Sequence, residues 1–192
     1  MDWVLLFTVL CGVVFANAAV DIERKRAVVK RLGMCKNQKT DDMPMQFYDT
    51  QVSHDKSKDT TISMKVNVTR VITNLSIVFN FCKCDFSGNP DSCEYVLSDY
   101  ANDEICYYIG KENEAWSIFI DHFDKKPLCP IKPGIYVLTN LPITTDFMKY
   151  LPISDAVWKL KLEGSDMGQP VSCVELEMQI STFLGKVKRK RH

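Results

Sequence analysis

The chain has 192 residues, and its 24 Lys and Arg balance 24 Asp and Glu, so the formal charge at pH 7 is zero. This length fits one domain, and the basic residues have no base-stacking aromatics beside them, which argues against nucleic acid as a partner. The balance conceals two basic ends, 24–31 and 186–191, with five Lys or Arg each, which leaves 14 basic against 21 acidic residues in 32–185. We interpret these ends as solubilising or disordered segments. Binding to anionic membranes and trimming by a convertase are the alternatives.

The first apolar segment, 3–15, carries no charge and is followed by Ala16-Asn17-Ala18, a pattern that signal peptidase recognises. The segment is too short for a membrane span, and no second apolar run follows it. We therefore predict a signal peptide at 1–18 and a secreted protein, although lysosomal proteins share these export features. The mature chain would begin with a basic N-terminal lead at 19–34.

Alternation of apolar and polar residues with a period of two predicts strands that each bury one face. Residues 62–69 show it first, with Ile62, Met64, Val66 and Val68 on one side. Turn signals separate the segments, so we expect an all-β fold, an antiparallel sandwich or cup. The other expected strands are 43–48, 75–81, 135–138, 156–163 and 174–180.

Two glycosylation sequons lie within this region, Asn67-Val68-Thr69 and Asn74-Leu75-Ser76. Asn67 is on the polar side of its predicted strand, where a glycan has room. Both asparagines are therefore predicted glycosylation sites, in agreement with export.

Residues 112–123 break the strand pattern and predict one short helix. Trp116, Phe119, Ile120 and Phe123 recur at i, i+3, i+4 and i+7, which is the helical period. The helix either packs on a sheet or rims an apolar cavity and touches lipid or a membrane. The sequence leaves both interpretations open.

Seven cysteines remain once Cys11 leaves with the signal peptide, and three of them fall in 82–93, CKCDFSGNPDSC. This cluster lacks a second pair of ligands at zinc-finger spacing, so we expect no metal. In an oxidising compartment either Cys82 or Cys84 would close a short loop onto Cys93. Seven is an odd number, so one thiol is free or joins a second chain.

Catalytic motifs are missing from the sequence. It has no G-x-S-x-G elbow, P-loop or H-E-x-x-H. His54 and His122 are the only histidines in residues 32–185, and we find no candidate nucleophile for either of them. We expect no enzyme and no cofactor.

The stretch 128–136, LCPIKPGIY, resembles the C-P-x-x-x-G-x-Y segment of ganglioside activator proteins. Residues 155–160, DAVWKL, resemble their G-x-Y-R-I strand, and 173–176, CVEL, resemble their final C-I-K-I strand. Over residues 35–182 the chain is thus similar to the ML lipid-recognition superfamily, most of all to insect chemosensory B proteins and their secreted relatives. It lacks one paired cysteine of the ganglioside activators, and its counterpart of their G-x-Y strand begins with Asp-Ala-Val-Trp. We therefore do not expect this chain to activate ganglioside hydrolysis.

The resemblance implies a β-cup at 35–183, in which two antiparallel sheets surround an apolar cavity, with a basic tail at 184–192. It also implies the pairs Cys35–Cys173, Cys84–Cys93 and Cys106–Cys129. Cys82 is then the odd thiol, and Cys82–Cys93 is the alternative pairing.

The function expected from the resemblance is a secreted, non-enzymatic carrier of a lipid, fatty acid, hydrocarbon or pheromone. Its partners would be that ligand, a membrane in transient contact and a receptor protein; the chain would be a monomer, or a disulfide-linked dimer through the odd cysteine. The alternative is a secreted interaction or signalling protein with a filled core, and each pocket residue has core packing as its alternative role. The predicted ligand-pocket residues are Phe79, Phe81, Trp116, Phe119, Phe123, Tyr136, Leu138, Trp158 and Leu160.

Overall fold

The computed structural model describes residues 21–36, 38–54, 60–114, 116–143 and 153–186, so the predicted signal peptide lies outside the described residues. The chain divides into two compact units, one formed by residues 25–181 and the other by the chain ends, 1–24 and 182–192. Within the unit of the chain ends, 21–24 and 182–186 are strand. The core and the sites described below lie in residues 25–181.

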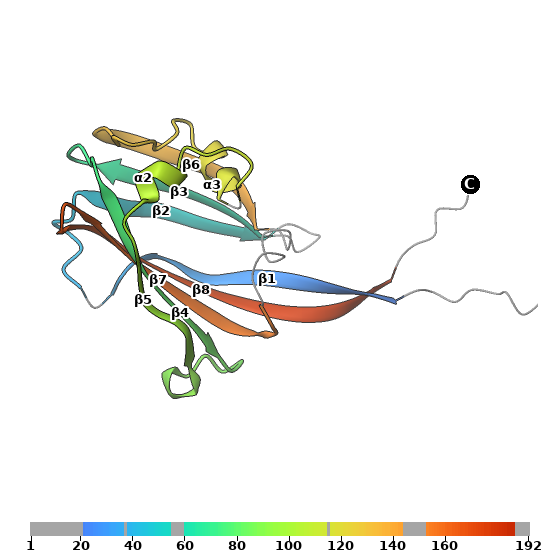
Figure 1. Ribbon diagram of the computed structural model, residues 1–192. Helices are drawn as coiled ribbons and strands as arrows, with labels where there is room; N and C mark the ends of the chain where they lie inside the picture. The colour runs from blue at the N-terminus through green and yellow to red at the C-terminus, as the bar shows by residue number, and fades with distance from the viewer. Residues whose placement is uncertain (1–20, 37, 55–59, 115, 144–152, 187–192) are drawn as a thin grey trace, which may run out of the picture. The chain divides into compact units, whose positions relative to one another are not determined.

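The fold is all-β, as the sequence predicts, with two antiparallel sheets (Figure 1). The larger sheet has the strand order β1-β8-β7-β4-β5, and the smaller one has the order β2-β3-β6. Short helical segments occur only in connections of the described chain. The elements are β1 (Asp21–Met34), β2 (Met45–His54), β3 (Thr60–Val68), β4 (Leu75–Cys84), η1 (Pro90–Ser92), β5 (Glu94–Asn102), α2 (Ile105–Tyr108), α3 (Ser117–Asp121), β6 (Gly134–Ile143), β7 (Ala156–Asp166) and β8 (Gln169–Lys186).

The predicted helix at 112–123 is wrong in its extent. Among the described residues of this range only Ser117–Asp121 is helical, and a second short helix, Ile105–Tyr108, was not predicted. Asn113 has a φ of 62°, a left-handed backbone conformation that a right-handed helix cannot contain. The helical spacing of the apolar residues therefore extends beyond the helix that forms.

Most of the predicted basic N-terminal lead, 19–34, is strand: β1 occupies 21–34 and borders β8. Ala27 is 4% exposed and Val29 is 5% exposed, so both belong to the core. Lys and Arg surround these two residues, so the sequence analysis interpreted the segment as a basic end and not as a strand. The folded region thus begins before residue 35, and β8 extends to Lys186, past the predicted boundary at 184.

The core consists of three clusters of buried side chains. One joins β3 to the start of β4 and to β8 through Val68, Leu75 and Val171. A second lies around Trp158 of β7, and a third contains Leu138 of β6. Because each cluster unites residues of distant segments, hydrophobic burial holds the sheets together at three places.

Three disulfides reinforce these contacts, and they are the three predicted pairs. Cys35–Cys173 joins the end of β1 to β8, Cys84–Cys93 joins β4 to the start of β5, and Cys106–Cys129 joins α2 to the segment before β6. Cys82 is the free cysteine of the described residues. The sequence analysis had kept Cys82–Cys93 as the alternative pairing, and the structure has Cys84–Cys93 instead.

A buried carboxylate, Asp166 at the end of β7, holds the segment that precedes β4. It is 5% exposed and accepts a hydrogen bond from Arg70 Nη1 at 2.5 Å. The backbone N–H groups of Thr73 and Asn74 donate to its Oδ1 at 3.1 and 2.8 Å. The bond from Arg70, followed by that from the Asn74 N–H, lowers the pKa of Asp166 from its ordinary value of 3.8 to about 2.

This lowered pKa predicts how stability depends on acid. The folded protein binds the Asp166 proton less tightly than the unfolded chain, so the carboxylate stabilises the fold above about pH 4 and loses this contribution as the pH falls toward about 2. Chemical unfolding followed at pH 7, 4, 3 and 2 should show a smaller loss of stability in this window for Asp166→Asn. Arg70→Gln removes the hydrogen bond that lowers the pKa of Asp166 most. Its loss of stability in this window should lie between those of the wild type and Asp166→Asn. An unchanged acid dependence in both variants would contradict this role.

Candidate functional site

The inner face of the five-stranded sheet is the face turned toward the three-stranded sheet. Leu176 of β8 identifies it, because this side chain packs against a core cluster that contains residues of β3 and β6. In the strand register Leu176 pairs with Leu160, Leu160 pairs with Phe81, and Leu162 pairs with Phe79. Directly paired residues share a face of a sheet, so all five side chains lie on the inner face.

Three of these inner residues, Phe79, Leu160 and Leu162, are called here the inner apolar row. They lie on β4 and β7 near the centre of the sheet, yet they are only half-buried. Among the described residues, none of the three core clusters includes them. In a closed sandwich, apolar side chains on the inner face of central strands are normally among the most buried. The row is therefore apolar surface that the described core does not use.

The row continues to the β5 edge of the sheet. Tyr100 pairs with Phe79, and their ring centroids are 6.2 Å apart. Leu97 pairs with Phe81. Tyr100 is 53% exposed and Leu97 is 37% exposed, so solvent reaches this end of the row.

The nine predicted pocket residues fall into four sets: in the core, at its border, in the inner apolar row and around α3. Tyr136, Leu138 and Trp158 are buried members of the core clusters. Phe81 stacks on Trp158 with ring centroids 4.8 Å apart, at the border between core and row. Only Phe79 and Leu160 belong to the inner apolar row, and the sequence analysis missed its third member, Leu162. Leu162 could have been predicted, because it lies two residues after Leu160 in the alternating pattern of β7.

The remaining three predicted residues belong to the segment around α3. Phe119 and Phe123 are half-buried and pack against the core clusters. The indole N–H of Trp116 donates to the carbonyl oxygen of Tyr108 at 3.0 Å and so ties the start of α3 to α2. No described contact connects Trp116 to the inner apolar row.

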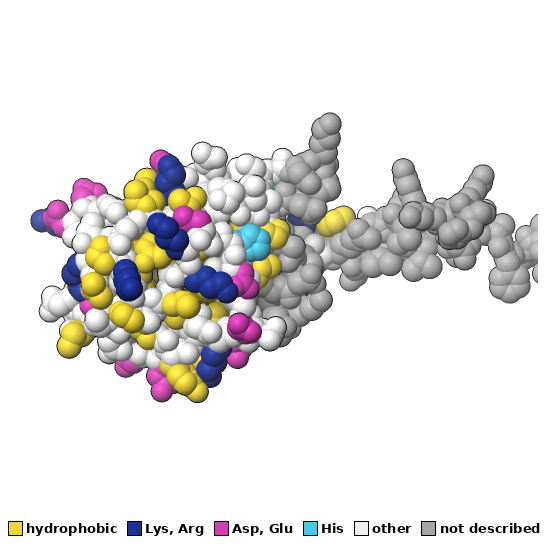
Figure 2. All heavy atoms as spheres, turned by 90° about the horizontal axis from the view of Figure 1, so that it is seen from above, with side chains coloured by type: hydrophobic (Ala, Val, Ile, Leu, Met, Phe, Trp, Pro, Cys, Tyr) yellow, Lys and Arg dark blue, Asp and Glu magenta, His cyan; other side chains and the backbone are white. Residues whose placement is uncertain are grey.

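The surface over α2, α3 and β6 mixes apolar side chains with both basic and acidic ones, as the space-filling view shows (Figure 2). Tyr107 of α2 is 65% exposed, and Lys111 Nζ lies 3.9 Å from the centroid of its ring. Leu128 and Ile135 are also exposed. Such a mixture suits contact with a lipid surface or with a protein.

A concavity of about 680 Å³ lies on the outer face of the five-stranded sheet. Its lining alternates in charge: Lys159 and Lys161 of β7 face Glu175 and Glu177 of β8. Arg31 of β1 donates to Glu175 at 2.6 Å. Leu160 and Leu176 also line it, but most of its lining is charged or polar, so it is not the apolar cavity that the resemblance implies. No sequence pattern singled it out, because its lining comes mainly from five different strands.

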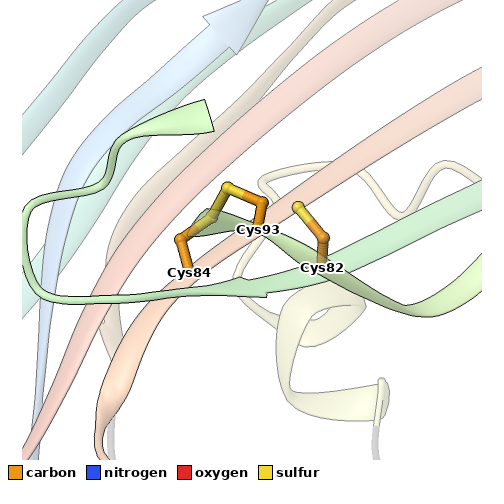
Figure 3. A group of neighbouring side chains, drawn as sticks. All are labelled: Cys82, Cys84 and Cys93. Atoms are coloured by element: carbon orange, nitrogen blue, oxygen red, sulfur yellow. A yellow bond between two sulfur atoms is a disulfide. The ribbon is translucent and has the colours of Figure 1, made fainter. Parts of the chain in front are cut away.

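Cys82, which lines this concavity, is one of three cysteines whose sulfur atoms lie close together (Figure 3). Cys82, Cys84 and Cys93 have their Sγ atoms within 4.8 Å of one another, and the last two form a disulfide. In this oxidised form Cys84 and Cys93 have no thiolate to offer a metal ion. Burial raises the pKa of the Cys82 thiol, and the nearby Lys159 opposes this rise.

The two histidines of the body make local contacts. His122 Nδ1 lies 2.6 Å from the carbonyl oxygen of Ile118, one helical turn earlier. His54 Nδ1 lies 3.1 Å from Thr60 Oγ1, whose own hydroxyl donates to the carbonyl oxygen of Ala27 at 3.0 Å. Thr60 is 1% exposed, so its hydroxyl is shielded from solvent.

The two sequon asparagines lie where glycans have space. Asn67 of β3 alternates with the buried Val66 and Val68, so its side chain is on the outer face of the small sheet. Asn74 is exposed just before β4.

The comparisons with known proteins add no relative to this description. No family model and no curated protein matches the chain. Among the described residues, no helix is long and apolar enough to cross a membrane. The case for a function therefore rests on the inner apolar row and on the sequence patterns.

Proposed function

We propose that this protein is a secreted, non-enzymatic binding protein for a hydrophobic ligand, namely a lipid, a fatty acid or a hydrocarbon. The ligand would lie on the inner apolar row, between the sheets, and enter from the β5 edge. Apolar contact would supply the affinity, and polar groups at the edge would orient the ligand.

The half-buried state of the row is the observation that carries this proposal. A carrier must keep apolar surface accessible inside its fold, and the row does so on β4 and β7, each of which has a hydrogen-bonded neighbouring strand on both sides. An inner face that is not fully packed lacks some van der Waals contacts, and the three core clusters around the row compensate for this loss of stability. The three disulfides have the same effect, because they constrain the unfolded chain.

The sequence supports the wider setting of this proposal. The apolar N-terminal segment, the sequons at Asn67 and Asn74 and the paired cysteines all favour export. The resemblance to the ML superfamily favours a lipid cup, and its chemosensory members suggest pheromones or cuticular hydrocarbons as ligands. Membrane contact through the mixed surface of α2 and α3 would let the protein collect or deliver such a ligand.

One observation favours a second candidate, a secreted interaction protein that works through β5. This edge strand is exposed along its length up to Ala101 and carries Tyr95, Val96, Leu97 and Tyr100. An exposed apolar edge is a template for pairing with another strand. Mass spectrometry under non-denaturing conditions separates the two candidates, since a carrier retains lipid and an interaction protein forms a dimer or binds no lipid.

A matched pair of variants tests ligand binding. Leu162→Trp places an indole on the inner face, whereas Lys161→Trp places one on the outer face of the same strand. We expect Leu162→Trp to weaken binding of a fluorescent fatty-acid probe about tenfold, which corresponds to about 1.4 kcal/mol. Lys161→Trp should leave the affinity within about twofold. Probe titration of the oxidised protein, with displacement by long-chain hydrocarbons, measures both.

Circular dichroism and thermal unfolding must show that both variants retain the fold. Equal weakening by the two tryptophans would place the probe elsewhere than on the inner face. No saturable binding by the folded wild-type protein would refute the carrier and leave the interaction protein.

A further inference from the structure

The free thiol of Cys82 lies beside a disulfide of the same chain. Cys82 and Cys84 are two residues apart on β4, so their side chains share the outer face of the sheet. Cys93, which directly precedes β5, is disulfide-bonded to Cys84 and is a diagonal neighbour of Cys82, which pairs with Tyr95. All three Sγ atoms lie within 4.8 Å of one another (Figure 3).

The strand that directly follows Cys93, β5, is weakly anchored. Most of β5 is exposed, and none of its residues is buried. Its ladder with β4 shifts register twice, between Phe79 and Phe81 and again between Phe81 and Cys82. Closing the remaining gap between Cys82 and Cys93 thus requires movement of an irregular, exposed edge strand rather than movement of the core.

We propose that Cys82, Cys84 and Cys93 form a thiol–disulfide exchange site, in which the bond moves from Cys84–Cys93 to Cys82–Cys93. Its substrate is the disulfide of the same chain. This inference is independent of ligand binding at the inner apolar row.

The exchange is balanced without an oxidant. The Cys82 thiol releases its proton to solvent, and the thiolate attacks Sγ of Cys93. The Cys82–Cys93 bond forms while the Cys84–Cys93 bond breaks, and Cys84 leaves as a thiolate that takes a proton from solvent. One thiol and one disulfide are present before and after the step.

The exchange changes which thiol the chain presents. In the structure the free thiol is the half-buried Cys82, which lines the outer concavity. After exchange it is Cys84, which is 2% exposed. The chain thus alternates between an accessible and a protected thiol, and the attachment of β5 to β4 changes with it.

Peptide mapping of the full-length oxidised protein tests the proposal, because trypsin cleaves after Lys83, between Cys82 and Cys84. The protein is kept at about pH 9, where more of the thiol is ionised, for increasing times. It is then unfolded in guanidinium chloride with excess N-ethylmaleimide, so that buried thiols are blocked as well. N-glycans are then removed, and the peptides are analysed without reduction. We expect the label to shift with time from Cys82 to Cys84, and peptide 71–83 to become linked to peptide 84–111.

Two variants complete the design. Cys84→Ser should form Cys82–Cys93 and contain no free thiol, whereas Cys82→Ser should keep Cys84–Cys93 and take up no label. Mapping of the other two disulfides shows that each variant is folded. Label that stays on Cys82 in the wild type at all times overturns the proposal, as do two free thiols in folded Cys84→Ser. A linked product whose rate rises with protein concentration would also overturn it, since exchange would then occur between chains.

Discussion

Replacing Trp158 by alanine is expected to lower the free energy of unfolding by about 4 kcal/mol, near the upper end of large-to-small core substitutions. Trp158 is 4% exposed, belongs to a core cluster and stacks on Phe81. Its indole N–H also donates to the carbonyl oxygen of Ser154 at 2.9 Å. The truncation therefore leaves a cavity and an unpaired carbonyl group. Urea unfolding monitored by circular dichroism measures the loss.

Trp116→Ala is the matched control for this expectation. Trp116 also makes one indole hydrogen bond to a carbonyl, but it is half-buried and belongs to no core cluster of the described residues. Its removal should cost about 1 kcal/mol, in the range of one intramolecular hydrogen bond. Equal losses for the two tryptophans would contradict the distinction between core and periphery drawn above. The comparison also shows why Trp158 is a poor probe of ligand binding, since its truncation changes stability first.

Removing the disulfide Cys35–Cys173 is expected to cost about 5 kcal/mol, the largest effect among the three bonds, according to the chain-entropy model. The bond spans 138 residues, against 23 for Cys106–Cys129 and nine for Cys84–Cys93. A longer closed loop restricts the unfolded chain more strongly, so the same model assigns about 3 kcal/mol to the middle bond and about 2.5 kcal/mol to the short one. Paired Cys→Ala variants of each bond, unfolded in guanidinium chloride, test this order.

The location of the long bond adds a second reason for its rank. Cys35 and Cys173 are 4% and 0% exposed, and the N–H of Cys35 donates to the carbonyl oxygen of Cys173 at 3.0 Å. The bond thus fixes the end of β1 against β8 inside the core. If the Cys84–Cys93 variant proved the least stable of the three, loop length would not control the contribution of these disulfides. The free Cys82 should be changed to alanine in every variant, so that it does not replace a removed partner.

The strands that were predicted correctly are those with two contrasting faces. In β3 the alternation of Ile62, Val66 and Val68 with polar residues follows directly from one face meeting the core. β5 was missed because it buries nothing, so burial imposed no pattern on its residues. β1 was missed because Lys and Arg surround the two small residues that it buries.

The candidate site could be predicted only in part. Apolar spacing indicated Phe79 and Leu160, but it could not tell a half-buried row from a filled core, because both require the same residues on the same face. Tyr136, Leu138 and Trp158 have the same pattern and lie in the core instead. Which residues stay accessible depends on where the three-stranded sheet covers the five-stranded one, and no local pattern records that.

The sequence by itself determined the all-β class and the main strands, because alternation is a local consequence of burial. The three disulfide pairs were predicted through the resemblance, with Cys82–Cys93 kept as the alternative to Cys84–Cys93. The tertiary structure alone decided that β1 belongs to the sheet, that the inner apolar row is left partly open, and that Cys82 lies beside the Cys84–Cys93 bond. These features arise from the packing and pairing of segments distant in the chain. Their physical origin is long-range burial and strand register, which a linear pattern does not encode.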